Sequence, residues 1–192
     1  MSRGNAIEIP GYVAGTWTID PGHSEVGFTV RHLMVNTVRG HFTRFKGEIV
    51  TGEDPLNSRV TATIDTSSID TNNEQRDADM RTANYLGIAS HPVMTYRSTS
   101  VRREEDGFLV VGDLSLHGVT REVPLRLKVN GITKDPWGGT RAGFSATGEI
   151  DRRDFRITTN IPMDDGGVVV GEKIRIIIEV EAVLNQPQQR GT

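Results

Sequence analysis

Alternation of apolar and polar residues constrains this chain most, because a period of two is typical of half-buried β-strands. The clearest runs cover residues 26–32, 59–65, 122–129, 141–150 and 173–184, and less regular strands are expected over 38–50, 93–101 and 108–116. A sheet of about eight such strands must close or stack, because open edges invite aggregation. A chain of 192 residues without an internal repeat or linker favours closure. The sequence therefore predicts an all-β fold built as an antiparallel barrel.

Turn residues separate these runs. Asp106-Gly107 and Asn130-Gly131 are dipeptides that favour tight hairpin turns, because Asn and Gly accept positive φ at low cost. Further breaks are expected at residues 53–55 and 164–167, which are rich in Asp, Pro and Gly.

One segment departs from the strand pattern. Residues 74–86 contain good helix formers and neither Pro nor Gly. Thr71 and Glu74 have the spacing of a capping box, and Gly87 stands where a left-handed residue would end a helix. The segment has few apolar residues, so we expect one short helix that lies over an end of the barrel.

Composition excludes several classes of protein. A formal net charge of −3 argues against a nucleic-acid binder, and the absence of cysteine excludes disulfides and thiolate metal sites. No apolar run approaches the roughly 20 residues of a membrane-spanning helix. The first fifteen residues mix charge, Pro and Gly without an apolar stretch, unlike a secretory signal, so we expect a cytoplasmic location.

Six small residues interrupt the apolar faces of the expected strands: Ala62, Gly112, Ala142, Ala146, Gly148 and Ala182. Such residues either let large neighbours pack closely or leave a void inside the barrel. An apolar void is costly when empty and is a good site for an apolar guest. Alternation alone leaves both a filled and a hollow barrel open.

Five segments, in order along the chain, resemble motifs of the YceI-like family of polyisoprenoid-binding proteins. They are WTIDPGHSEVGFTVRH, IDTNNEQRDADMRTANYL, HPVMTYRS, GDLSLHGVTREVPLRL and GFSATGEIDRRDFRI. One departure from the family pattern is Arg156, which follows Asp-Phe where the family usually has glycine.

This resemblance implies an eight-stranded lipocalin-like barrel with a long apolar pocket, as one domain over residues 15–184 between flexible tails at 1–14 and 185–192. It also implies a non-enzymatic role in the binding, transport or sequestration of a long-chain isoprenoid, an isoprenoid quinone or another amphiphilic lipid. No cofactor is required for such a role. Many members of the family carry an export signal, and that feature is not transferred to this chain.

Removal of hydrocarbon from water would hold such a ligand, so the candidate lining residues are apolar. They are Phe28, Val30, Phe42, Val60, Ala62, Ile64, Leu114, Phe144, Ala146, Ile176 and Ile178. A phosphate head group at the mouth would pair with arginine, whose guanidinium matches phosphate bidentately. The candidates are Arg31, Arg39, Arg44 and Arg81, whereas a quinone or amide head group needs no charge.

Three other functions stay open. The five histidines (His23, His32, His41, His91 and His117) leave room for a metal or haem site, in which His32 and His41 would meet across a hairpin turn near Asn36. A hydrolase would depend on Ser115 and His117, which have no obvious acid partner. A filled barrel would serve as an interaction module, and Ile177, which breaks the alternation, makes a homodimer plausible.

Overall fold

The computed structural model describes residues 8–161, 163–164 and 169–186. The strands are β1 (Gly15–Ile19), β2 (Glu25–His32), β3 (Asn36–Phe42), β4 (Phe45–Thr51), β5 (Arg59–Asp65), β6 (Ile69–Asp70), β7 (Val93–Glu104), β8 (Gly107–Leu116), β9 (Val119–Lys134), β10 (Thr140–Asp151) and β11 (Val170–Leu184). One α-helix, α1 (Glu74–Arg81), and four short 3-10 helices, η1 (Pro21–His23), η2 (Pro55–Asn57), η3 (Thr66–Ser68) and η4 (Arg152–Phe155), complete the described part.

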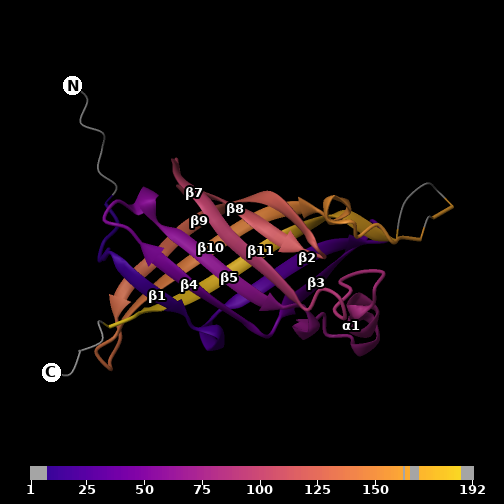
Figure 1. Ribbon diagram of the computed structural model, residues 1–192, viewed down its shortest axis with the longest axis horizontal. Coiled ribbons are helices and arrows are strands. Elements are labelled where there is room, and N and C mark those ends of the chain that lie inside the picture. Colours follow the sequence, from indigo (N-terminus) through magenta and orange to yellow (C-terminus); the bar gives the residue numbers. More distant parts are fainter. Residues whose placement is uncertain (1–7, 162, 165–168, 187–192) are drawn as a thin grey trace.

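Eight strands form a closed antiparallel barrel in the order β1-β4-β5-β7-β8-β9-β10-β11, because β11 also pairs with β1 (Figure 1). β2 follows β1 along β11, with Ile19 opposite Ala182 and Glu25 opposite Glu179. β2, β3 and β6 continue the sheet from the other part of β11: β2 pairs with β11, β3 pairs with β2, and β6 pairs with β3. The barrel predicted from the alternation is therefore confirmed, with some long strands divided by short breaks.

One predicted hairpin turn is wrong. A tight turn does join β7 to β8, but at residues 105–106, one residue before the predicted Asp106-Gly107, with Glu104 opposite Gly107. At Asn130-Gly131, however, β9 continues to Lys134, and the register with β10 shifts by one residue. Asn130 and Gly131 form a β-bulge, which uses the same tolerance of unusual φ as a turn (Gly131 φ 156°). The chain reverses instead over residues 135–139. Of the break predicted at 164–167, residues 165–167 lie outside the described residues.

The predicted helix is shorter than expected and has a different cap. α1 ends at Arg81, and the chain continues through turns to Gly87, which does have positive φ (57°). The capping residue is Asn73, whose side-chain oxygen accepts from the backbone N–H of Arg76 at 2.9 Å. Thr71 instead donates its backbone N–H and hydroxyl to the Asp77 carboxylate.

The helix lies near one end of the barrel (Figure 1). No helix within the described ranges has the length and apolar character to span a membrane.

Four of the six small residues make room for large side chains. Ala142 and Ala182 pack against the fully buried Trp17, whose Nε1 donates to Thr51 Oγ1 at 2.9 Å. A Cβ at Gly112 would lie 2.6 Å from Cζ of Tyr96. In the same way, a Cβ at Gly148 would lie 2.7 Å from Cδ2 of Leu125. The remaining two, Ala62 and Ala146, line a cavity.

Arg156 adopts the left-handed conformation (φ 59°) immediately after η4. Its backbone N–H donates to the carbonyl of Arg153 at 2.9 Å. Glycine adopts this conformation at low cost, which explains why the family usually has glycine at the position where this chain has arginine.

Candidate functional site

A cavity of about 340 Å³ runs inside the barrel, within the roughly 300–1,000 Å³ typical of small-molecule sites. Most of the strands contribute apolar side chains to its wall, and Met80, Tyr85 and Leu86 close it from α1 and the following turn. On β11 the wall extends from Val170 to Val180. At about 3.3 Å per residue, this stretch is about 30 Å long.

All eleven candidate lining residues lie on the wall of this cavity. They come from six different strands that the barrel brings together, and Ala146 faces inward between Leu127 of β9 and Ile178 of β11. Their contact with a ligand stays a prediction.

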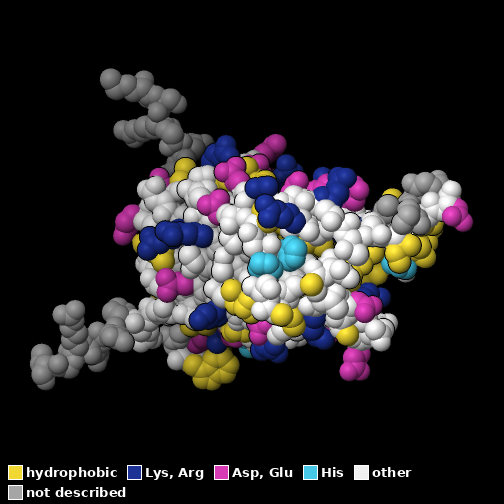
Figure 2. Space-filling view, turned by 45° about the vertical axis from the view of Figure 1, so that its right-hand side comes forward, with side chains coloured by type: hydrophobic (Ala, Val, Ile, Leu, Met, Phe, Trp, Pro, Cys, Tyr) yellow, Lys and Arg dark blue, Asp and Glu magenta, His cyan; other side chains and the backbone are white. Residues whose placement is uncertain are grey.

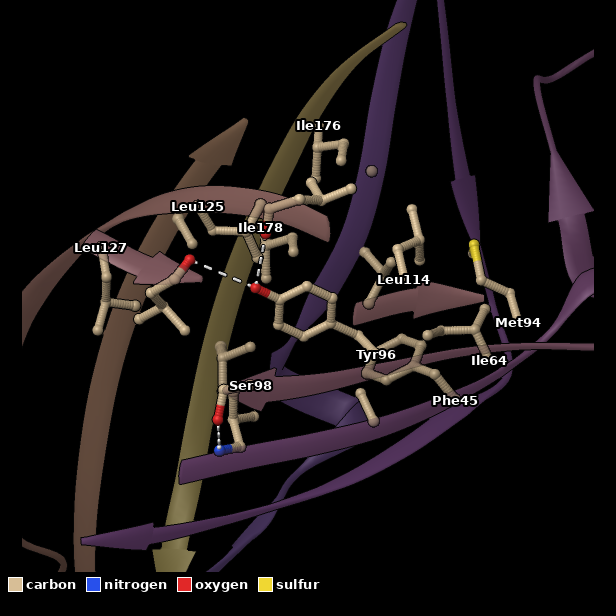
Figure 3. Close-up of a pocket in the computed structure, with 18 of the residues that line it drawn as sticks. Phe45, Ile64, Met94, Tyr96, Ser98, Leu114, Leu125, Leu127, Ile176 and Ile178 are labelled. Atoms are coloured by element: carbon tan, nitrogen blue, oxygen red, sulfur yellow. Dashed lines mark hydrogen bonds between the residues drawn. The ribbon is translucent and has the colours of Figure 1, made fainter. Parts of the chain in front are cut away.

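Tyr96 is a polar member of the wall that the sequence analysis missed. Its ring projects from β7 among Leu114, Leu125 and Ile178 (Figure 3). The hydroxyl donates to the carbonyl of Val123 at 3.0 Å and lies 3.4 Å from that of Val110, and burial raises the pKa of the phenol. The sequence does carry a signal for this position, because Tyr96 falls on the same face of β7 as Met94 and Ser98, each two residues away.

Ser98 is a second polar residue of the wall whose hydroxyl is engaged by the protein. Ser98 Oγ accepts from the backbone N–H of Val60 at 2.8 Å (Figure 3). Among the described residues, every buried side-chain nitrogen and oxygen has a hydrogen-bond partner. The cavity therefore offers a guest mainly hydrocarbon surface.

Arg152 is a buried cation at the end of the cavity that contains Val170. Only 4% of its surface is exposed, and its guanidinium donates to the carbonyls of Ile157 (2.6 Å), Thr159 (3.0 Å) and Gly171 (3.0 Å). Burial lowers the pKa of this guanidinium. Carbonyl acceptors on both sides show that Arg152 joins the segment after η4 to the start of β11.

The opposite end of the cavity reaches the surface. Arg59 lines the cavity and is exposed, and Tyr12 and Ser58 lie beside it. The Tyr12 hydroxyl donates to the carbonyl of Gly52 at 2.7 Å, so part of the segment expected as a tail at residues 1–14 packs against the barrel. The domain boundaries themselves stay a prediction.

The four head-group arginines do not line the cavity. Arg31 donates to the carbonyl of Met34, and Arg39 is exposed on β3. Arg44 forms an ion pair with Asp65 at 2.9 Å, while Arg81 donates to the carbonyls of Ser67 and Ile69. The arginines of the wall are instead Arg59 and Arg152.

The histidines do not converge as the metal hypothesis expected. His32 lies opposite Asn36 and His41 opposite Gly27, so the two do not meet across the hairpin. The hairpin turn lies at residues 33–35, before Asn36. The rings that do meet are those of His91 and His117, with centroids 5.0 Å apart.

Asp20, His23 and Glu181 form a polar cluster at the surface, with their oxygen and nitrogen atoms within 4.8 Å of one another. Arg141 donates to both carboxylates, at 3.1 Å to Asp20 and 2.5 Å to Glu181. Hydrogen bonds from His23 and Arg141 lower the pKa of Asp20. The cluster is an ion-pair network in which Arg141 bridges the two acids.

Ser115 and His117 do not form a catalytic pair. The Ser115 hydroxyl lies 2.6 Å from Thr120 Oγ1, and Nδ1 of His117 lies 3.0 Å from the carbonyl of Phe155. His117 belongs to the turn after β8 rather than to the strand, with φ 51°. Each of the two side chains is therefore paired with a different residue.

Comparison with known proteins gives one consistent result. Residues 17–182 match the model of the YceI-like domain family. "Protein YceI" of Salmonella newport (strain SL254) is 40% identical over 174 residues, which cover 89% of this chain and 88% of that protein.

Solved structures agree in fold. The Campylobacter jejuni YCEI protein matches with a TM-score of 0.69 at 26% identity, over 87% of this chain and 96% of that one. A polyisoprenoid binding domain from Saccharophagus degradans, implicated in plant cell wall breakdown, matches with a TM-score of 0.65 at 16% identity, over 90% of this chain and all of that one. The chain belongs to the YceI-like domain family.

Proposed function

We propose that this protein binds the tail of a long-chain isoprenoid or similar amphiphilic lipid inside the barrel, and carries or sequesters it without chemical change. The observation that carries this proposal is the long cavity with an almost wholly apolar wall. The polyisoprenoid binding domain with the same fold supports this class of ligand.

The length of the wall favours a long tail. Four chain carbons per isoprene unit, at C–C lengths of about 1.5 Å, give a rise of roughly 5 Å. The wall of about 30 Å then accommodates about six units, a length comparable to the whole hydrocarbon core of a bilayer (about 30 Å). An ordinary membrane acyl chain spans only one leaflet, so the barrel fits a longer molecule.

Hydrocarbon burial supplies the affinity. Each buried CH₂ is worth about 0.8 kcal/mol, so a five-carbon unit contributes about 4 kcal/mol before the cost of ordering the chain. Selectivity then depends on length and branching, because Tyr96 and Ser98 already use their hydroxyls on the protein backbone.

The same pairing of polar groups supports a non-enzymatic role. A nucleophile needs a base within hydrogen-bond reach and space for a reacting atom. Ser115, the hydroxyl considered for hydrolysis, does not line the cavity and pairs with Thr120. The cytoplasmic location and the homodimer stay predictions from the sequence.

Native mass spectrometry of freshly purified protein tests the proposal, followed by solvent extraction and identification of the released molecule. We expect a non-covalent mass with a long hydrocarbon tail, and delipidated protein that takes up an eight-unit prenyl alcohol better than a two-unit one. Binding of zinc and of haem, measured in parallel, tests the metal hypothesis. Protein that is free of lipid, and that takes up neither alcohol, would reject lipid binding.

A further inference from the structure

Four large apolar side chains are exposed together where the β2–β3 hairpin ends. Leu33, Met34 and Val35 form the turn and are 38%, 52% and 82% exposed, and Ile161 is 66% exposed. Backbone hydrogen bonds from Leu33 to Val169, and from Val169 to Ile161, bring the backbone of Ile161 close to the start of this turn. We call these four residues the hairpin tip. Hydrophobic side chains gather at the projecting right-hand end of the molecule (Figure 2).

The backbone of this turn makes its sequence unusual. Leu33 and Met34 both have positive φ (49° and 57°), and the Val35 N–H donates to the His32 carbonyl at 3.2 Å. This is the geometry of a type I′ turn, in which Asn-Gly is favoured and large side chains are strained. The chain thus accepts backbone strain in order to present leucine and methionine to solvent. Strain of this kind is typical of functional sites.

After its first residue, the β2–β3 hairpin carries only positive charge, whereas one exposed acid, Asp164, lies in the loop that contains Ile161. Between Glu25 and Glu48 the sequence contains no acidic residue, while Arg31 and Arg39 lie on the two strands of the hairpin and both are exposed. Arg31 Nη2 donates to the Met34 carbonyl at 2.7 Å, which holds this cation directly below the apolar side chains. Apolar residues flanked by arginine are suited to a surface with an acidic outer layer and a hydrocarbon interior.

We propose that the hairpin tip inserts into the boundary between head groups and acyl chains of an anionic lipid bilayer. A second copy of the chain is a poorer partner, because a stable interface needs about 800 Å² from each protein and four side chains on a narrow projection supply much less. The tip is also continuous with the cavity, since Val30 and Val170 of the wall lie on the strands that carry it. Insertion therefore brings this end of the cavity to the membrane.

The Leu33→Asn/Met34→Gly double variant tests this proposal. It removes two apolar side chains and installs the dipeptide that the turn prefers, so its thermal midpoint is expected to equal or exceed that of the unchanged protein. Binding to vesicles of phosphatidylcholine and phosphatidylglycerol, measured by flotation, is expected to fall at least tenfold. Trp137→Asn removes an 84% exposed side chain from the β9–β10 turn and is the matched control, expected to bind as the unchanged protein does.

Two further measurements separate the alternatives. Arg39→Gln is expected to weaken binding to these anionic vesicles more than to vesicles of phosphatidylcholine alone. Native mass spectrometry of the double variant is expected to show the same barrel content as the unchanged protein, so failure of membrane docking and failure of lipid carriage are distinguishable.

Three results would overturn the proposal: no vesicle binding by the unchanged protein, equal binding by the double variant, or a dimer without vesicles that the double variant converts to a monomer.

Discussion

Replacement of Ala146 by tryptophan is expected to abolish lipid uptake while the barrel stays folded. Ala146 lies on the cavity wall of β10, opposite Ile178 of β11. An indole at this position projects into the cavity, because residues of a strand alternate between its two faces and Ala146 faces inward. The wall continues past Ile178 for eight residues toward Val170 and for two residues toward Val180.

These stretches set the size of the effect. At about 3.3 Å per residue they are about 26 Å and about 7 Å long. Even the shorter one holds roughly one isoprene unit, worth about 4 kcal/mol before ordering costs. If half of that survives the ordering costs, the affinity falls more than tenfold, and loss of the longer stretch removes nearly all of it.

The assay uses delipidated protein with an eight-unit prenyl alcohol, and native mass spectrometry counts the bound fraction. Thr147→Trp is the matched control, because Thr147 is the next residue of β10 and faces outward. Circular dichroism and the thermal midpoint establish that both variants are folded. A folded Ala146→Trp variant that takes up the alcohol as well as the Thr147→Trp control would refute the assignment of Ala146 to the lining.

Three other perturbations test the framework around the cavity. Trp17→Ala is expected to cost about 4 kcal/mol of unfolding free energy and to lower the thermal midpoint by roughly 8–16 °C, since Trp17 is fully buried. Gly112→Ala is expected to cost about 1–3 kcal/mol in chemical denaturation, because its Cβ would lie 2.6 Å from the Tyr96 ring. Hydrogen bonds from Arg153 hold the pKa of Asp151 below its usual range, so this carboxylate stabilises the fold above about pH 4, and the stabilisation is lost as the pH falls. Asp151→Asn is therefore expected to flatten the decline in thermal midpoint between pH 5 and pH 2, and an unchanged decline would contradict this role.

The barrel was predictable because strand alternation is a local property of the sequence. A residue such as Ile176 reports its own inward position through its neighbours two places away. Asn130-Gly131 failed as a turn because the same backbone tolerance serves a β-bulge, and only the pairing with β10 distinguishes the two. The helix ended early because its sparse apolar residues left little packing to hold a longer one.

The interior was less predictable because it depends on which side chains meet across strands. Ala142 and Ala182 are small because Trp17 fills the space between them, whereas Ala62 and Ala146 face open space. The four alanines look alike in the sequence, and the barrel's register separates them. Arg152 belonged to a recognised motif, but its burial against carbonyls far along the chain carries no local signal.

Two features of this chain lower the stability of its fold, and both involve apolar surface. A cavity of about 340 Å³ leaves the apolar side chains of its wall without packing partners on one side, which costs stability. Leu33 and Met34 add strain at a turn for which Asn-Gly would be favoured. A chain that keeps two departures from local consistency keeps them for function. Our two proposals account for both with hydrocarbon: a lipid tail would fill the first and a bilayer would cover the second, and the two would meet at the end of the barrel where Val30 and Val170 lie.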